Sequence, residues 1–340
     1  MNLSEQAART DARPAGEAPT LDVRGLSVVL PRLSGDITLV QELDLTVGPG
    51  ERVALVGESG SGKTVTAQAI MRLNPHVRIG GSVSFEGVDL LPLPEKRMRE
   101  YRGAKMAAVF QDPLRSLNPV MSIGNQVTEP LTLRGVSRKA ALQKAAGLLD
   151  ELGVARAKER LAAYPHEFSG GMRQRVALAM ALIADPTLLI ADEPTTALDV
   201  RVQEKVLSLI DSVARERGLA VILITHDLGL VAGFADKVAV MYAGRKIEEQ
   251  PVAGLYARPQ HPYTVGLLAA VPRIDREVDR LATIPGSPVT PTTRPAGCPF
   301  HPRCPRRIDR CETDRPELLP LSVGGAVACH VVTGKEQSDA

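Results

Sequence analysis

The alternation of apolar and polar positions predicts a series of strands along the chain. Residues 21–30 and 37–47 alternate as half-buried strands do. Shorter runs predict further strands over residues 52–56 and 105–110, and buried parallel strands over residues 187–190 and 220–225. We also expect a strand pair over residues 80–90 and a hairpin formed by residues 237–242 and 246–250.

A helical period replaces this alternation in two places. Residues 64–73 predict a helix that follows the strand at 52–56 after a glycine-rich loop. Residues 112–167 are helical in pattern, and within residues 137–152 one face carries Leu142, Ala145, Ala146, Leu149 and Leu152. The chain therefore reads as an α/β core with an inserted helical subdomain.

The amino-acid composition of the chain changes after residue 257. Proline becomes dense, and the four cysteines all fall between Cys298 and Cys329. We interpret residues 258–335 as a second, loop-rich module. Residues 1–20 have no apolar core, so we expect a disordered tail rather than a secretory signal.

Composition narrows the class of protein. Apolar residues make up 44% of the 340 residues, whereas aromatics make up 3% and tryptophan is absent, so the core must be mainly aliphatic. A net charge of +2 argues against nucleic acid or an anionic membrane as the main partner. The apolar run at 176–184 is shorter than the roughly 20 residues that span a bilayer. We expect a cytoplasmic chain that reaches any membrane through a partner.

A phosphate-binding P-loop separates the strand at 52–56 from the helix that follows. Its residues are Gly57, Glu58, Ser59, Gly60, Ser61, Gly62, Lys63 and Thr64. Backbone amides of such a loop hold phosphate oxygens, and the helix adds its positive end. Lys63 is expected to reach the β and γ phosphates and Thr64 to ligate Mg²⁺. A chance glycine turn is the alternative, and the strand-loop-helix order argues against it.

Two carboxylates end the apolar strand that begins at residue 187. Asp192 lies where a P-loop enzyme places its Mg²⁺-organising acid, and Glu193 is the candidate general base for the attacking water. The alternative is a helix cap before Pro194. The upstream P-loop favours the catalytic interpretation.

The order of several further residues along the chain supports a functional role for them. Ser169, Gly170, Gly171 and Met172 stand at a predicted helix start, His226 follows the strand at 220–225, and Gln111 follows the strand at 105–110. With the P-loop and Asp192-Glu193, this order over roughly residues 21–250 resembles the ATP-binding cassette (ABC) ATPases, and we expect residues 21–257 to form the nucleotide-binding domain.

The resemblance implies the roles of several residues. His226 would contact the γ-phosphate, and Gln111 would help to place Mg²⁺ and water. Residues 169–172 of one subunit would close over the ATP held by another, and Asp199 would lie in the segment that crosses this interface. The implied fold is a P-loop cassette with a RecA-like α/β core, an antiparallel β subdomain and an inserted helical subdomain.

Two departures from the family pattern stand out. The signature reads Phe168-Ser-Gly-Gly-Met rather than Leu-Ser-Gly-Gly-Gln, but its serine and glycines are intact. Residues 27–30 lack the aromatic that the family stacks on adenine. We therefore expect an aliphatic side chain such as Leu30 to hold the base, with comparable affinities for ATP and GTP.

Several short sequence motifs resemble those of the ATPases of bacterial dipeptide and oligopeptide importers. They lie at residues 109–113, 116–119, 164–172, 261–264 and 297–304. This resemblance implies two membrane permeases, a second ATPase subunit that is usually a different chain, and an extracytoplasmic peptide-binding protein. The chain would lie peripherally on the cytoplasmic face of the membrane, and residues 258–335 would be the subfamily's C-terminal extension.

The cysteines Cys298, Cys304, Cys311 and Cys329 predict a metal-stapled loop. A cytoplasmic chain rarely keeps structural disulfides, and spacers of five, six and seventeen residues lack the tight pairs of zinc sites. Looser spacing suits an iron–sulfur cluster. The resemblance implies a four-iron four-sulfur cluster; zinc is the second choice and free thiols the third. His301 and His330 could substitute as ligands, although surface roles are favoured.

Other functions stay open at this point. A soluble cassette ATPase acting on DNA or ribosomes would favour a basic stripe, which the near-neutral chain lacks. A P-loop kinase or GTPase would not need residues 168–172 or His226. A regulatory iron–sulfur sensor is a third alternative. Within importers, the cargo could be a peptide, nickel, glutathione or another small solute.

Overall fold

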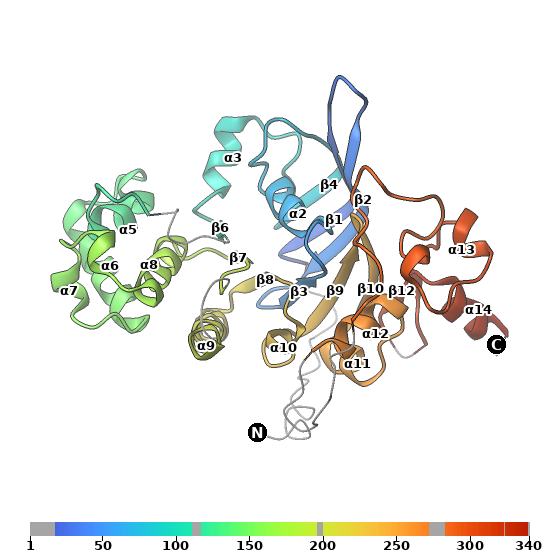
Figure 1. Ribbon diagram of the computed structural model, residues 1–340. Coiled ribbons are helices and arrows are strands. Elements are labelled where there is room, and N and C mark those ends of the chain that lie inside the picture. Colours follow the sequence, from blue (N-terminus) through green and yellow to red (C-terminus); the bar gives the residue numbers. More distant parts are fainter. Residues whose placement is uncertain (1–17, 111–116, 196–199, 272–282, 323, 339–340) are drawn as a thin grey trace.

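Two β-sheets stacked against each other form the centre of the protein in the computed structural model, which describes residues 18–110, 117–195, 200–271, 283–322 and 324–338 (Figure 1). The smaller sheet is antiparallel, with the strand order β2-β1-β4-β5. Its strands are β1 (Leu21–Leu30), β2 (Ile37–Val47), β4 (Arg78–Phe85) and β5 (Val88–Asp89). The alternation along the sequence predicted the bounds of β1 and β2, and the strand pair expected over residues 80–90 is β4 with β5.

The larger sheet has the strand order β11-β12-β10-β9-β3-β8-β7-β6. Its parallel strands are β3 (Arg52–Val56), β6 (Met106–Val109), β7 (Leu188–Asp192), β8 (Ala220–Thr225) and β9 (Lys237–Tyr242). The antiparallel strands are β10 (Arg245–Pro251), β11 (Leu319–Pro320) and β12 (Ala326–Val327). Because β12 pairs with β10, the C-terminal module continues the main sheet.

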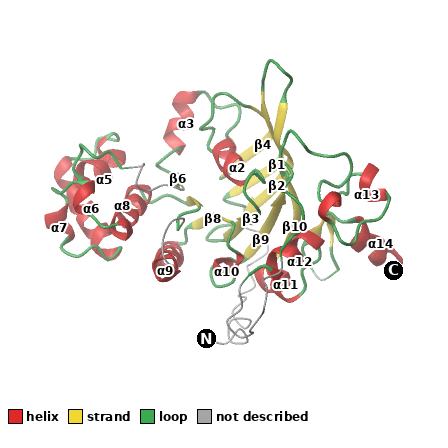
Figure 2. Ribbon diagram, viewed as in Figure 1, coloured by secondary structure: helices red, strands yellow, loops and turns green. Residues whose placement is uncertain are grey.

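Helices surround the two sheets, with a separate helical group inserted between β6 and β7 (Figure 2). That group contains α5 (Ile123–Thr132), α6 (Arg138–Glu151), α7 (Ala157–Arg160) and α8 (Gly170–Leu182), so the expected helical subdomain is confirmed. The other helices of the first half are α2 (Lys63–Ile70) and α3 (Glu95–Tyr101). Those of the second half are α9 (Val200–Arg217), α10 (Leu228–Val231), α11 (Val252–Ala257), α12 (Pro262–Ala269), α13 (Arg310–Thr313) and α14 (His330–Ser338).

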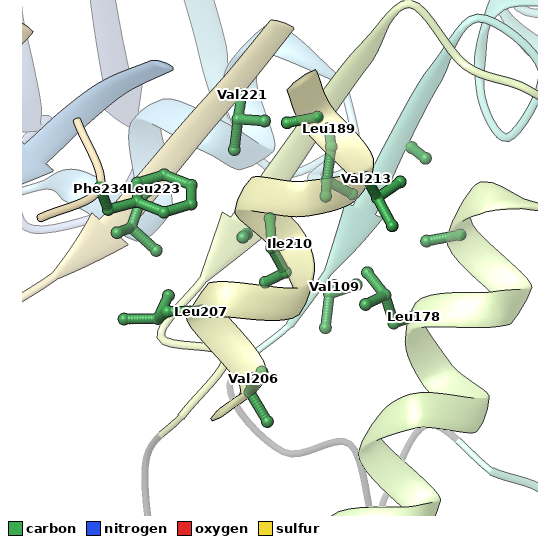
Figure 3. Packing of buried hydrophobic residues seen from close by; sticks show 14 of the residues in the cluster. Val109, Leu178, Leu189, Val206, Leu207, Ile210, Val213, Val221, Leu223 and Phe234 are labelled. Carbon is green, nitrogen blue, oxygen red and sulfur yellow. The ribbon is translucent and has the colours of Figure 1, made fainter. Parts of the chain in front are cut away.

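The alternating faces of the main sheet divide the interior into two cores. On β3, Val53 and Leu55 face the antiparallel sheet and α2, whereas Ala54 and Val56 face the opposite side. That opposite side packs on α9, whose Val206, Leu207, Ile210 and Val213 lie against Val221, Leu223 and Leu189 of the sheet (Figure 3). A sheet covered on both faces explains why these strands are continuously apolar in sequence.

The helical subdomain and the C-terminal module lie on opposite sides of the sheets (Figure 1). Within α6, Ala145 and Leu149 are buried as the helical period predicted, and Leu142 and Ala146 are half-buried. The expected disordered tail lies outside the described residues as far as residue 17. Among the helices that the structure describes, none combines the length and the apolar character needed to cross a bilayer.

Candidate functional site

The carboxyl ends of three parallel strands meet at one edge of the main sheet. Strand β8 lies between β3 and β7, with Val56 paired to Thr225 and Asp192 paired to Ile224. The P-loop follows β3, Asp192 and Glu193 end β7, and His226 follows β8. Parallel pairing therefore gathers the candidate residues from distant parts of the sequence at one edge.

The P-loop has a backbone that requires glycine at its first position. Gly57 has φ +153°, and a Cβ placed there would lie 2.2 Å from the carbonyl oxygen of Met241 on β9. The loop then turns into α2, which begins at Lys63 after the left-handed Gly62. The glycines thus let the loop lie against the sheet and aim the N-terminus of α2 at the same edge.

Lys63 is a buried cation at the centre of this loop. Its Nζ donates to the carbonyl oxygens of Gly57 (2.7 Å) and Glu58 (3.0 Å). Burial lowers the pKa of Lys63, while the negative charges of Glu193, Asp192 and Glu58 act in the opposite direction. A phosphate in the loop would give this desolvated ammonium an anionic partner.

Thr64 and Asp192 bring two oxygen ligands together beside Lys63. The Thr64 hydroxyl donates to Oδ1 of Asp192 at 3.1 Å, and Asp192 is 1% exposed. Burial raises the pKa of Asp192, and the Glu193 charge adds to that rise. Mg²⁺ in nucleotide sites takes one or two carboxylates together with substrate phosphates. The pair is a suitable half-site for this ion.

Glu193 and His226 form a second pair at the same edge. The Nδ1 atom of His226 lies 3.1 Å from Oε1 of Glu193, and the backbone N–H of Glu193 donates to the Ile224 carbonyl oxygen at 2.9 Å. Glu193 has a left-handed backbone (φ +47°), a conformation that is costly for a residue with a side chain. The Glu193 side chain remains 15% exposed, so water can reach it.

The signature residues start helix α8 of the helical subdomain. Ser169 is the N-cap residue, Ser169 and Gly170 are exposed, and Gly171 and Met172 are half-buried. Gln174 of the same helix is buried and donates to the Pro194 carbonyl oxygen at 2.7 Å. Helix α8 is therefore tied to the loop that follows Glu193, while its N-cap serine and its first residue are exposed.

Two predicted site residues, Gln111 and Asp199, lie outside the described residues. Leu30, the candidate adenine contact, is the half-buried last residue of β1.

The four cysteines are free thiols that lie close to one another. Burial, with a further contribution from Cys311, Cys329 and Cys304, raises the pKa of Cys298 to about 12. Burial likewise raises the pKa of Cys304 and of Cys329, whereas metal ligation requires thiolates. Among the described residues, no three His, Cys, Asp or Glu side chains are arranged to hold a metal ion. The structure thus does not support the expected cluster as a preformed site. His301 and His330 each hydrogen-bond a backbone carbonyl oxygen at 2.9 Å.

Comparison with known families separates the two parts of the chain. Residues 40–196 match the ABC transporter family, and residues 247–311 match the oligopeptide/dipeptide transporter C-terminal region. The oligopeptide transport ATP-binding protein OppD of Salmonella typhimurium is 47% identical, over 97% of this chain and 98% of its own length. This chain belongs to the ABC transporter family. It is an ABC-type ATPase with the C-terminal extension of the peptide-transport branch.

Further relatives agree with this family assignment. OppD of Escherichia coli is also 47% identical, over 91% of this ABC ATPase and 92% of its own length. A bacterial ABC transporter cassette solved as a dimer matches with a TM-score of 0.61 and 26% identity, covering 68% of this chain and 98% of that chain. The same cassette in a post-hydrolysis state, with ADP and phosphate bound, matches with a TM-score of 0.59 and 26% identity, over the same shares. The expected cassette fold is thereby confirmed.

Sequence reasoning missed two residues of the C-terminal extension that contact the P-loop. The Tyr263 hydroxyl accepts a hydrogen bond from the Glu58 N–H at 2.8 Å, and Arg303 forms an ion pair with the Glu58 carboxylate. Both residues stand in phrases that resemble the peptide importers, but nothing in the local pattern indicates a contact with residue 58.

The buried Asp192 carboxylate makes a prediction about stability. Folding raises the pKa of this carboxyl group. Below the unfolded-state pKa the group is protonated in both states, so it costs no stability. As pH rises from there through the folded-state pKa, ionisation lowers the free energy of unfolding until the full cost is reached. Asp192→Asn keeps an acceptor for Thr64 and removes the charge. We expect the nucleotide-free variant to melt a few degrees higher at neutral pH, on the scale of about 2–4 °C per kcal/mol.

Calorimetry of both chains from acidic to neutral pH checks this. The difference in melting temperature should narrow toward low pH, and Mg²⁺-dependent ATP hydrolysis should be lost in the variant. A variant that melts lower than the wild type at neutral pH contradicts the prediction.

Proposed function

We propose that this chain is the ATP-hydrolysing subunit of a membrane importer for dipeptides or oligopeptides. The observation that carries the proposal is the convergence of the P-loop, Asp192 and the Glu193–His226 pair at one sheet edge. Two findings support peptides as the cargo. The same chain carries the C-terminal region of the oligopeptide/dipeptide transporters, and its relatives are named as oligopeptide transport ATP-binding proteins.

The exposed start of α8 supports a site that is shared between two subunits. Ser169 and Gly170 present an N-cap serine and the free N–H groups of a helix start to solvent. These groups suit the γ-phosphate of an ATP held by the P-loop of a second subunit. Two subunits placed head to tail would each supply this surface to the other. The solved ABC transporter cassette that matches this chain with a TM-score of 0.61 is itself dimeric.

Within each site, the residues of this chain divide the work. The P-loop amides and Lys63 would bind the phosphates, and Thr64 with Asp192 would hold Mg²⁺, which would supply positive charge to the phosphates. Glu193 orients a water and accepts its proton, while His226 holds the Glu193 carboxylate in place. By resemblance, His226 would also contact the γ-phosphate. By resemblance, Gln111 would assist at the Mg²⁺ and water positions, and Asp199 would lie in the segment that crosses the subunit interface.

ATP binding would close the dimer and hydrolysis would reopen it, so that a two-state interface drives the permeases. The proposed surface for the permease coupling helices includes residues 112–118, of which 112–116 lie outside the described residues. The other proposed partners are two integral-membrane permeases, a second and related ATPase chain, and an extracytoplasmic peptide-binding protein. The proposed location is the cytoplasmic face of the membrane, where the chain is held through the permeases.

Replacement of the proposed base tests this assignment. Glu193→Gln keeps the size and polarity of the side chain but cannot take a proton from water. We expect ATP hydrolysis to fall by roughly 10²-fold or more, the scale of losing a positioned base, while ATP still binds. Steady-state phosphate release and equilibrium ATP binding are the measurements.

Two further variants serve as references. Lys63→Ala should weaken nucleotide binding itself, because it removes the buried cation of the loop. Glu159→Gln changes an exposed glutamate of α7 in the same way chemically and should hydrolyse ATP at the wild-type rate. Undiminished turnover in Glu193→Gln would defeat the assignment of the base.

We also propose that the extension binds a four-iron four-sulfur cluster, with zinc as the second choice. Four adjacent free thiols in a loop-rich module support this, together with the resemblance to the importer ATPases. Burial raises the pKa of Cys298, Cys304 and Cys329, and the described side chains do not form a ready-made ligand set, so loading would have to ionise and reposition the cysteines.

Elemental analysis of an anaerobic preparation checks the cluster. We expect iron and acid-labile sulfide in near-equal amounts, and broad absorbance in the visible range that disappears when cysteines are replaced. A preparation that holds zinc without sulfide supports the second choice. A preparation with neither metal contradicts both.

A further inference from the structure

A carboxylate inside the P-loop is held by the C-terminal extension. The Arg303 guanidinium donates to both oxygens of Glu58, from Nη1 to Oε2 at 2.7 Å and from Nη2 to Oε1 at 3.1 Å. Such two-pronged contacts fix the direction of a carboxylate as well as its charge. The Tyr263 hydroxyl accepts from the backbone N–H of the same residue at 2.8 Å. The extension therefore holds both the backbone and the side chain of Glu58.

Arg303 is itself rigidly placed. Its side chain is only 4% exposed, and its Nε donates to the Pro285 carbonyl oxygen at 2.9 Å. The guanidinium lies 5.9 Å from the ring centres of both Tyr242 and Phe300. Packing against aromatic rings and a fixed fork of donors leave the group little freedom to move. The cation is thus built into the protein beside the P-loop rather than resting on its surface.

The charge of Glu58 acts on the phosphate-binding machinery. Glu58 is one of the three carboxylates whose charges raise the pKa of Lys63 against the effect of burial. Its carbonyl oxygen also accepts from Lys63 Nζ at 3.0 Å. A carboxylate that attracts Lys63 also repels the phosphates that Lys63 would bind. Arg303 supplies the opposite charge and pairs with both oxygens of that carboxylate.

We propose that Arg303 is a positioning residue for the nucleotide site: it neutralises Glu58 and fixes the P-loop in a shape that accepts ATP phosphates. The C-terminal extension then influences the affinity for ATP in addition to stabilising the fold. This inference rests on the proposed role of the P-loop as the ATP site. It assigns to Arg303, which lies 245 positions from Glu58, control over the loop.

A double-mutant cycle separates this role from a structural one. The full-length chain is purified in four forms: the wild type, Arg303→Ala, Glu58→Gln and the double variant. The dissociation constant for ATP with Mg²⁺ is measured before turnover, and KM and kcat follow. We expect Arg303→Ala to raise the dissociation constant and KM about tenfold, with kcat changed far less.

The decisive comparison is made without the carboxylate. When Glu58 is already glutamine, no negative charge remains to be neutralised, so adding Arg303→Ala should change the dissociation constant by less than about twofold. If the second substitution instead weakens binding as much as it does in the wild type, Arg303 serves only the fold and the proposal is overturned. Wild-type affinity in Arg303→Ala overturns it as well.

Further variants guard against misfolding. Arg310→Ala removes an exposed arginine of the same extension, which pairs with Asp314 at 3.0 Å, and should bind ATP as the wild type does. Arg303→Lys keeps the charge without the two-pronged fork and should raise the dissociation constant less than Arg303→Ala. If Arg303→Ala does not fold, the same cycle made with Arg303→Lys decides the question by the same criterion. Failure of the wild type to bind ATP would instead overturn the P-loop assignment itself.

Discussion

The site depends on one geometric constraint, which is that neighbouring parallel strands end at the same edge of a sheet. Strands β3, β8 and β7 deliver the P-loop, His226 and the pair Asp192-Glu193 to that edge, although more than 160 positions separate the first from the last along the chain. Burial then changes the chemistry of what is delivered. Burial lowers the pKa of Lys63 and raises the pKa of Asp192, because it disfavours the charged form of each group. A bound phosphate would stabilise the charged Lys63, and a bound cation would stabilise the charged Asp192. ATP with Mg²⁺ supplies both.

The C-terminal extension is part of the same arrangement. Its Tyr263 and Phe300 pack with Tyr242 of β9, with ring centres 4.7 and 5.3 Å apart respectively. The fully buried Glu248 of β10 accepts the N–H of His261 at 2.9 Å, and burial lowers the pKa of His261 to about 3, which keeps that ring neutral. These contacts anchor the extension on the strands beside the P-loop. They explain how a loop-rich module with small strands can hold residues accurately enough to act on the nucleotide site.

The sequence predicted the strands well because burial on one or both faces leaves a readable period. The bounds of β1, β2, β3, β8 and β9 follow from that period. The glycines mark the P-loop, because a residue with a Cβ in place of Gly57 would clash with the backbone of β9. The proposed roles of Glu193 and His226 rest on strand ends combined with a family pattern. The contact of Arg303 with Glu58 could not be predicted, because an ion pair between distant positions leaves no local period. Cysteine spacing likewise indicated that the thiols gather, but it could not show their burial or their geometry as ligands.

The central claim is that this ATPase works as one half of a closing pair that drives membrane permeases. The most direct test is to purify the tagged chain from gently solubilised membranes and to identify the proteins that remain bound in stoichiometric amounts. The account predicts two polytopic permeases and a second cassette ATPase, either a related chain or another copy, in an assembly that hydrolyses ATP. Recovery of nucleic acid or ribosomal proteins, or of no membrane protein at all, would contradict it.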